Sequence, residues 1–282
     1  MTSETSEELV VTAAGPGEWK TVTGWAADEG WNPGTSDTES FFAQDPEGFF
    51  IGRLRGEPVS AVSVVNYGDD YAFLGFYLVR PDLRGRGLGI ATWRAGLAHA
   101  GSRTVGLDGV PAQQDNYRAS GFRLAHTTAR FSGRTTPGRP APDVRPVEPA
   151  DLAAVAAYDS ACCPADRPRF LERWLTGPGH RALVRFVDGR LTGYGVIRPA
   201  RDAARVGPLF ADTAEDARAL LHALTADGQP YAVDVPTTNA AGVALAGELG
   251  LTPSFDTARM YTGPVRPCAR DRIFGVTTLE LG

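Results

Sequence analysis

The sequence predicts an α/β (α+β) protein built from two tandem copies of one unit, each a mixed β-sheet with helices on its faces. Two observations carry this prediction. A stretch with five prolines, residues 135–149, divides the 282 residues nearly in half, and this composition favours an extended linker over a core element. The two halves also match each other segment by segment, which indicates an internal repeat.

The chain is long enough for two domains. With 43% hydrophobic residues, it can bury two cores of ordinary size. We therefore expect a first domain at residues 1–134, the proline-rich linker at 135–149 and a second domain at 150–282.

The repeat consists of three corresponding pairs of segments. The first pair shares a turn followed by an alternating strand, and the second shares a strand with a central aspartate. The third pair shares a glycine that is followed at identical spacing by Thr-Ala-Arg. The pairs are residues 54–65 and 187–197, 106–110 and 232–236, and 121–131 and 250–260. Each copy reads as a helix, hairpin strands, a longer strand, a helix, a strand, a helix and final strands, which predicts a mixed sheet.

Composition excludes several classes of function. A net charge of −5 and a pI near 5.5 argue against non-specific nucleic-acid binding. The first ten residues are polar and acidic, unlike a signal peptide, and no apolar run could span a membrane. Cys162, Cys163 and Cys268 lack metal-ligand spacing and are expected to be structural thiols. We expect a cytoplasmic protein with no metal, membrane or nucleic-acid partner; a homodimer is left open.

A glycine-rich turn is the most informative motif. Residues 79–91 read VRPDLRGRGLGIA and link an apolar strand to a helix-like segment. Glycines tolerate positive φ, and a helix that starts after them presents free N–H groups and the positive end of its dipole. With Arg84 and Arg86, the turn predicts a cradle for a pyrophosphate. Ile90 stands where GxGxxG needs glycine, and no Gly-Lys-Ser/Thr follows, so dinucleotide and ATP loops do not fit.

One family shows this pattern together with a second motif. The sequence has R-x-x-G-x-G at Arg84, Gly87 and Gly89, after a strand that ends in Val-x-Pro, and NYRASGF at residues 116–122. The combination resembles the GNAT superfamily of acyl-CoA-dependent N-acyltransferases, over about residues 10–133. The resemblance implies acetyl-CoA as cofactor and a sheet that splays between two parallel strands, where the acyl-pantetheine arm enters.

The resemblance also implies the residues that hold the cofactor. Strand backbone would pair with the arm, loop amides would hold the pyrophosphate, and Leu88 would pack. The family's usual asparagine is Val110 here, and we consider Gln113, Gln114 and Asn116 as substitutes. The predicted cofactor residues are Leu78, Val79, Arg84, Gly85, Arg86, Gly87, Leu88, Gly89, Ile90 and Asn116.

The catalytic prediction has one matched residue and one open role. Tyr117 matches the family tyrosine that gives a proton to the departing thiolate. Asp108 ends the strand expected at residues 104–108. It either faces the cleft as a general base or caps the following turn. An ordered water is the other option for the base.

The acceptor is predicted to meet residues 24–34. By the resemblance, this segment borders the acceptor cleft, and its rings and carboxylates can attract a cationic amine. The candidates are Trp25, Asp28, Glu29 and Trp31.

The second half lacks the cofactor motifs. Residues 206–221 replace the glycine loop, with Asp212 or Thr213 as an ordinary helix cap, and the tyrosine position is Ala246, although Asn239 keeps the asparagine pattern. This half resembles the degenerate C-terminal domain of tandem GNAT proteins, which implies a non-catalytic partner that completes the acceptor cleft. Residues 271–282 alternate enough for a last strand, which we expect to cross to the first domain.

The leading functional hypothesis is acetyl transfer from acetyl-CoA to a primary amine of a small molecule, by direct attack in a ternary complex. The alternatives are an acyl-CoA-binding sensor without turnover, and a protein or peptide N-acetyltransferase.

Overall fold

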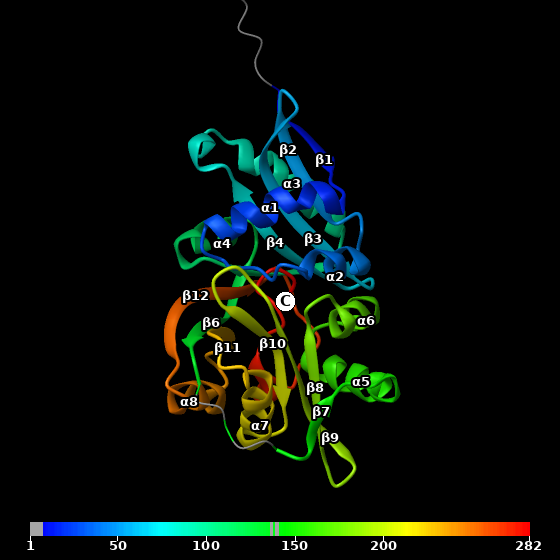
Figure 1. Cartoon of the computed structure of the whole chain (residues 1–282). Helices are drawn as coiled ribbons and strands as arrows, with labels where there is room; N and C mark the ends of the chain where they lie inside the picture. Colours follow the sequence, from blue (N-terminus) through cyan, green and yellow to red (C-terminus); the bar gives the residue numbers. More distant parts are fainter. Residues whose placement is uncertain (1–7, 136–137, 139–140) are drawn as a thin grey trace, which may run out of the picture.

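The strands of both halves form one continuous sheet in the computed structural model, which describes residues 8–135, 138 and 141–282. The order within these residues is β1-β2-β3-β4-β5-β12-β6-β11-β10-β9-β8-β7, with β13 paired to β10 (Figure 1). Two mixed-sheet units with the predicted element order are present, which confirms the predicted fold class.

The elements of the first half follow the predicted sequence of helix, hairpin, strand, helix and strand. They are β1 (Val10–Ala13), α1 (Pro16–Asp28), α2 (Asp37–Gln44), β2 (Phe49–Leu54), β3 (Glu57–Tyr67), β4 (Tyr71–Val79), α3 (Leu88–Ala100), β5 (Thr104–Gly109), α4 (Gln114–Ala119) and β6 (Arg123–Gly133).

The second half repeats this order. Its elements are β7 (Val144–Pro146), α5 (Leu152–Cys162), α6 (Pro168–Thr176), β8 (Arg181–Val187), β9 (Arg190–Arg198), β10 (Ala204–Ala211), α7 (Ala214–Leu224), β11 (Tyr231–Pro236), α8 (Ala240–Glu248), β12 (Thr252–Tyr261) and β13 (Ile273–Gly275). No helix in the described part of the chain is long and apolar enough to cross a membrane.

The two halves exchange their last long strands. β12 of the second half lies between β5 and β6, and β6 of the first half pairs with β11 (Figure 1). The register places Arg259 opposite Asp108 and Arg130 opposite Asp234. The repeated Thr-Ala-Arg motif and the repeated central aspartate are therefore the two sides of matching buried ion pairs between the halves.

Part of the proline-rich segment belongs to the sheet. β7, near the end of this segment, pairs with β8 and forms the edge of the sheet. Residues 136–137 and 139–140 of the predicted linker, and residues 1–7, lie outside the described residues.

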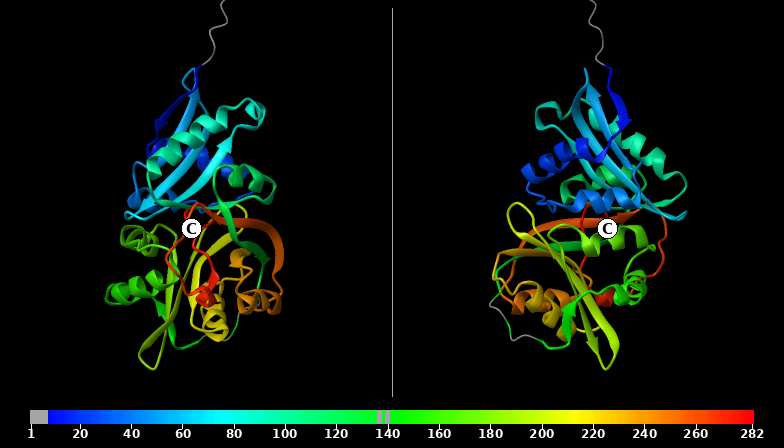
Figure 2. Two further views of the ribbon diagram at one scale, coloured as in Figure 1. Left: turned by 180° about the vertical axis from the view of Figure 1, so that it is seen from behind. Right: turned by 45° about the vertical axis from the view of Figure 1, so that its right-hand side comes forward.

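Helices cover both faces of the sheet, and one core continues from one half into the other. In the first half, α1 and α2 pack on one face and α3 and α4 on the other (Figure 2). Phe41 of α2 stacks on Trp174 of α6, with ring centroids 6.2 Å apart. Beside them, the Nε of Arg198 lies 2.9 Å from a carboxylate oxygen of Asp37, and both side chains are buried. Since apolar burial is the main stabilising contribution, the halves stabilise each other.

The adjacent cysteines lie in this core. Cys162 and Cys163 are free and buried, and burial raises the pKa of the Cys162 thiol to about 12. Such thiols are unreactive.

Candidate cofactor and acceptor site

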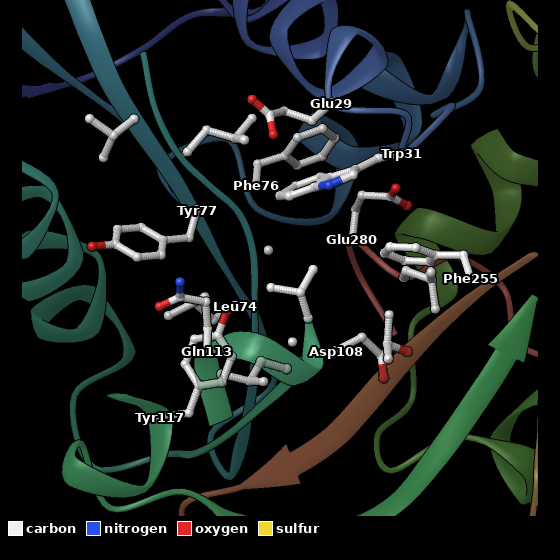
Figure 3. Close-up of a pocket in the computed structure, with 18 of the residues that line it drawn as sticks. Glu29, Trp31, Leu74, Phe76, Tyr77, Asp108, Gln113, Tyr117, Phe255 and Glu280 are labelled. Atoms are coloured by element: carbon white, nitrogen blue, oxygen red, sulfur yellow. The ribbon is translucent and has the colours of Figure 1, made fainter. Parts of the chain in front are cut away.

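A cavity of about 380 Å³ lies where β4 and β5 part (Figure 3). The parallel pairing of these strands ends at Leu74 and Leu107, while β4 continues to Val79. Beyond that point the edge of β4 lines the cavity at Leu78 and Val79. The sheet therefore splays between two neighbouring parallel strands, as the resemblance implies.

An irregularity in β4 accompanies the splay. Phe76 has a positive φ of 46°, and the pairing of β3 with β4 shifts register nearby. Gly75 lets another segment approach, because a Cβ there would collide with the carbonyl oxygen of Glu280. Backbone strain of this kind persists where surrounding contacts fix it.

The glycine-rich turn has the geometry of an anion cradle. Gly85 and Gly87 have φ of 76° and 77°, with open space where a Cβ would stand. Gly87 precedes α3, and no side chain caps that helix, so its first amides are free for a ligand. Leu88 is half-buried, Gly89 is buried and Ile90 is 45% exposed. The turn can therefore receive an anionic group.

The two arginines of the turn point to different places. Arg86 is exposed. Arg84 lines the cavity, donates from Nε to the Val79 carbonyl oxygen at 3.1 Å, and forms an ion pair with Glu29. The structure thus joins the predicted cofactor turn to the predicted acceptor segment at the mouth of the cavity.

Tyr117 lies on α4 at one end of the cavity, and its side chain is buried (Figure 3). Its ring stacks on Trp93 with centroids 5.8 Å apart, and a Cβ on Gly109 would collide with it. Burial raises the pKa of Tyr117 to about 12. The hydroxyl is therefore protonated at neutral pH and can donate a proton.

The polar residues near Tyr117 divide into two groups. Gln113 and Asn116 are both exposed, but only Gln113 lines the cavity, and Asn116 donates from Nδ2 to Oε1 of Gln113 at 2.6 Å. Of the side chains considered in place of the usual asparagine, Gln113 faces the cavity and Asn116 orients it. Gln114 accepts a hydrogen bond from Arg118 at 3.1 Å.

Asp108 lines the cavity in a third arrangement, neither free in the cleft nor capping a turn. Both of its carboxylate oxygens accept from Arg259 of β12, at 2.8 Å and 2.5 Å. Burial raises the pKa of Asp108, while Arg259 opposes the shift. Each oxygen is thus already bound to a guanidinium, and accepting a substrate proton would weaken this ion pair.

The predicted acceptor segment serves two neighbouring pockets. Glu29 and Trp31 line the cavity that Tyr117 and Asp108 also line. Trp25 and Asp28 line a second pocket of about 450 Å³ on the far side of Leu78 and Val79, and Asp28 forms an ion pair with Arg201 at 2.8 Å. The structure therefore brings two of the four candidates to the cavity that Tyr117 lines.

The β9–β10 connection of the second half and strand β6 of the first half hold the predicted acceptor segment in place. Asn32 donates from Nδ2 to the Ala203 carbonyl oxygen at 2.8 Å, and its Oδ1 accepts from the Asp202 amide at 3.0 Å. The Trp31 carbonyl oxygen accepts from Nη1 of Arg130 at 2.8 Å. The loop is thus built onto the β9–β10 connection and the exchanged strand β6.

Sequence reasoning missed several side chains that line the cavity, among them three aromatic rings and one carboxylate. Phe76 and Tyr77 come from β4, Phe255 comes from β12, and Glu280 follows β13 (Figure 3). The last two reach the site only through strand exchange and the return of residues 276–282 to the first half. One signal was available, namely the lone carboxylate in the otherwise uncharged stretch 276–282.

The equivalent gap of the second half is filled by the chain itself. β10 and β11 pair in parallel only from Ala204 to Val206, and β13 then pairs with β10. The Val276 amide donates to the Asp234 carbonyl oxygen of β11 at 2.8 Å. Thr213 caps α7, its side chain accepting from the Asp216 amide at 3.1 Å. At these places of the second half the gap is filled and one helix-start amide of α7 is already capped.

Family models match both halves. A model described as "Acetyltransferase (GNAT) family" matches residues 18–122, and one described as "Acetyltransferase (GNAT) domain" matches residues 155–275. The holothin acyltransferase of Pseudoalteromonas sp. (strain SANK 73390) is 35% identical over 269 residues, which cover 94% of this chain and 92% of that protein.

Solved structures share the fold over most of the chain. A putative acetyltransferase from Pyrococcus horikoshii has a TM-score of 0.84 at 22% identity, covering 97% of this chain and 96% of that one. A tandem GNAT protein from the clavulanic acid biosynthesis pathway has a TM-score of 0.63 at 19% identity, covering 91% and 99%.

Proposed function

Because this chain belongs to the GNAT acetyltransferase family, as a tandem acyltransferase, we propose that it transfers an acetyl group from acetyl-CoA to a primary amine of a small molecule. The reaction is direct attack in a ternary complex. The observation that carries this proposal is the single cavity that reaches from Tyr117 to Glu29 and Trp31 through the gap between β4 and β5.

The cofactor is assigned to the first half. The amides from Arg84 to Ile90 hold the pyrophosphate, and the backbone of Leu78 and Val79 pairs with the pantetheine arm. Bound acetyl-CoA supplies a thioester carbonyl for attack. Gln113 supplies a polar contact in place of the family's asparagine, and Asn116 orients it.

Tyr117 is assigned the proton that the thiolate needs. Its pKa of about 12 keeps the hydroxyl protonated, and its place on the cavity wall brings the proton near the departing sulfur. We keep Asp108 out of the proton transfer because Arg259 occupies both of its oxygens. It positions β12 instead.

A small acceptor is favoured by the size and lining of the site. A volume of about 380 Å³ lies at the low end of the roughly 300–1,000 Å³ of small-molecule pockets, and the cavity must also hold the acyl group. Trp31 and Glu29 give it a ring face and negative charge for an amine. Trp25 and Asp28 border the approach through the second pocket. The name of the Pseudoalteromonas relative specifies holothin as what that protein acylates.

The domain roles follow from this assignment. Residues 1–134 carry the cofactor site, the proline-rich residues 135–149 connect the halves, and residues 150–282 bind no CoA but supply part of the acceptor wall. The buried free thiols favour a reducing, cytoplasmic location.

The test is a thiol-release assay with acetyl-CoA and four amines, namely tyramine, histamine, spermidine and holothin, together with a lysine-containing peptide. We expect thiol release with at least one small amine and none with the peptide. Binding of acetyl-CoA without release in any arm would identify a sensor. Release with the peptide alone would identify a peptide acetyltransferase.

A further inference from the structure

Three carboxylates line the cavity within the described residues, and two of them are engaged. Glu29 pairs with Arg84, and Asp108 accepts twice from Arg259. Glu280 differs from both, because its side chain is buried and Oε2 has no hydrogen-bond partner. A buried acceptor without a partner costs about 1–3 kcal/mol, so its retention calls for a reason.

The Glu280 backbone is firmly held against β4. The amides of Glu280 and Leu281 both donate to the Thr278 hydroxyl, at 3.2 Å and 2.8 Å. The Tyr67 hydroxyl donates to the Leu281 carbonyl oxygen at 2.9 Å, and Gly75 leaves room for the Glu280 carbonyl group. This support fixes where the carboxylate enters the cavity, beside Trp31 and Phe255 (Figure 3).

Charged groups from four elements face Glu280. They are Arg205 of β10, Arg130 of β6, Asp37 of α2 and Arg198 of β9. The arginines already have carboxylate partners, since Arg130 and Arg205 bind Asp234 and Arg198 binds Asp37. Burial raises the pKa of Glu280 despite these arginines, so the carboxylate is more basic than an exposed one.

A purely structural role is the alternative. Nε and Nη1 of Arg205 are buried without partners, and the charge of Glu280 could serve only to balance that arginine. The two roles make different predictions, because charge balance affects stability whereas a proton acceptor affects the pH dependence of turnover.

We infer that Glu280 is the general base that receives the proton of the acceptor amine. This inference rests on the proposed function. The amine nitrogen forms a bond to the thioester carbonyl carbon, the C–S bond breaks, the nitrogen proton goes to Glu280, and Tyr117 gives its proton to the thiolate sulfur. The products are the amide and free CoA thiol, and both side chains regain their starting states by exchange with water.

The experiment compares wild type with Glu280→Gln, using acetyl-CoA and the most active amine of the panel. We expect kcat/KM of Glu280→Gln to fall by about 10²–10⁴-fold, the usual contribution of a general base, with little change in acetyl-CoA affinity. Wild-type kcat/KM falls as pH drops through the raised pKa of Glu280, above the ordinary glutamate value of about 4.3. The variant lacks this acid limb.

Two further variants keep the test independent of folding. Glu172→Gln, an exposed glutamate on α6, must behave as wild type. Glu280→Ala should be inactive and regain activity with added formate, which replaces the carboxylate. A Glu280→Gln chain that loses stability but keeps the wild-type pH profile would overturn this inference alone. A wild type that binds acetyl-CoA and acylates nothing would overturn the proposed function and this inference together.

Discussion

Each half has a gap between its two central parallel strands, and the gap is an open cavity in the first half but is filled by the chain in the second. In the first half, β4 and β5 separate beyond Leu74 and Leu107, and a cavity of about 380 Å³ occupies the gap. In the second half, β10 and β11 separate beyond Val206 and Val233, and β13 with Val276 fills the space. The same repeated unit can therefore leave this gap open or fill it with its own chain. The difference depends on β13 and Val276, which lie outside the repeated segments.

The helices that begin beside the two gaps also differ, in whether a side chain caps their first turn. α3 begins after Gly87 with no capping side chain, whereas α7 begins after Thr213, whose hydroxyl accepts from the Asp216 amide. Free amides bind an anion, and capped amides are already satisfied. The filled gap and the capped helix are therefore the two features that we expect to exclude the cofactor from the second half.

The buried ion pairs, in contrast, are retained in both halves. Arg259 meets Asp108 and Arg130 meets Asp234, each across an exchanged strand. Because the pair also occurs in the half without a ligand cavity at this place, we interpret it as a device that locks the exchanged strands. This is a further reason to look for the base elsewhere.

The largest expected effect comes from a negative side chain in the cradle of the first half. Gly87→Glu should weaken acetyl-CoA binding by more than about 100-fold, because the added carboxylate repels phosphate and fills the space that the turn leaves open. Calorimetric titration measures this. The matched control is Gly228→Glu, at a positive-φ glycine of the second half that also has open space around it. It carries the same backbone strain, and equal loss of binding there would contradict the assignment.

Removal of the Tyr117 hydroxyl should separate chemistry from binding. Tyr117→Phe is expected to lower kcat by about 10²–10⁴-fold, the usual range for a proton donor, while the Kd for acetyl-CoA stays within about twofold. Steady-state kinetics and titration of the same preparation decide the matter. An equal loss of kcat and of affinity would show that Tyr117 holds the cofactor instead.

The locking pairs should affect stability in both halves, but unequally. Burial raises the pKa of Asp234, yet Arg205 and Arg130 outweigh it and leave the pKa below its ordinary value, whereas the pKa of Asp108 stays raised. Asp234→Asn should therefore cost about 3–5 kcal/mol, the range for breaking a buried pair, and Asp108→Asn should cost less. Urea unfolding at pH 7 measures both.

The same pair gives a pH dependence with a defined sign. Because the folded-state pKa of Asp234 is lowered, its contribution is complete above the unfolded-state value of about 3.9 and is lost as pH falls through the folded-state pKa. Asp234→Asn should remove this acid-dependent part of the stability. An unchanged acid-unfolding curve would show that Asp234 does not stabilise the exchanged strand electrostatically.

The smallest expected effect lies at the capped helix. Thr213→Ala should destabilise the chain by about 1 kcal/mol, the typical value of an N-cap, and leave acetyl-CoA stoichiometry unchanged. Thermal unfolding and titration check the two parts. A second binding event in this variant would mean that the cap alone blocks the second half.

Sequence patterns predicted the fold class, the repeat, the glycine turn before α3 and a helix cap at Asp212 or Thr213, because each depends on local chemistry. Glycines at alternate positions and a hydroxyl before a helix act over a few residues. The exchange of β6 and β12 could not be predicted, since the same alternating pattern suits pairing within a half or between halves. The partner of Asp108 and the cavity contacts of Phe255 and Glu280 depend on that exchange and on the return of residues 276–282.

The split of the acceptor segment has a similar origin. The four candidates are close in sequence, but helix α1 ends at Asp28. The residues after the helix leave its axis and contact the second half through Asn32. The resemblance placed the segment beside the cleft, and neither it nor the sequence spacing could divide the four residues between two pockets.

The measurement that tests this account most directly is a calorimetric titration of the full chain with acetyl-CoA, in which stoichiometry is determined before affinity. The open gap of the first half and the filled gap of the second predict one molar equivalent per chain, abolished by Gly87→Glu and kept in Gly228→Glu. Two equivalents, or one that survives Gly87→Glu, would contradict the assignment of cofactor binding to the first half alone.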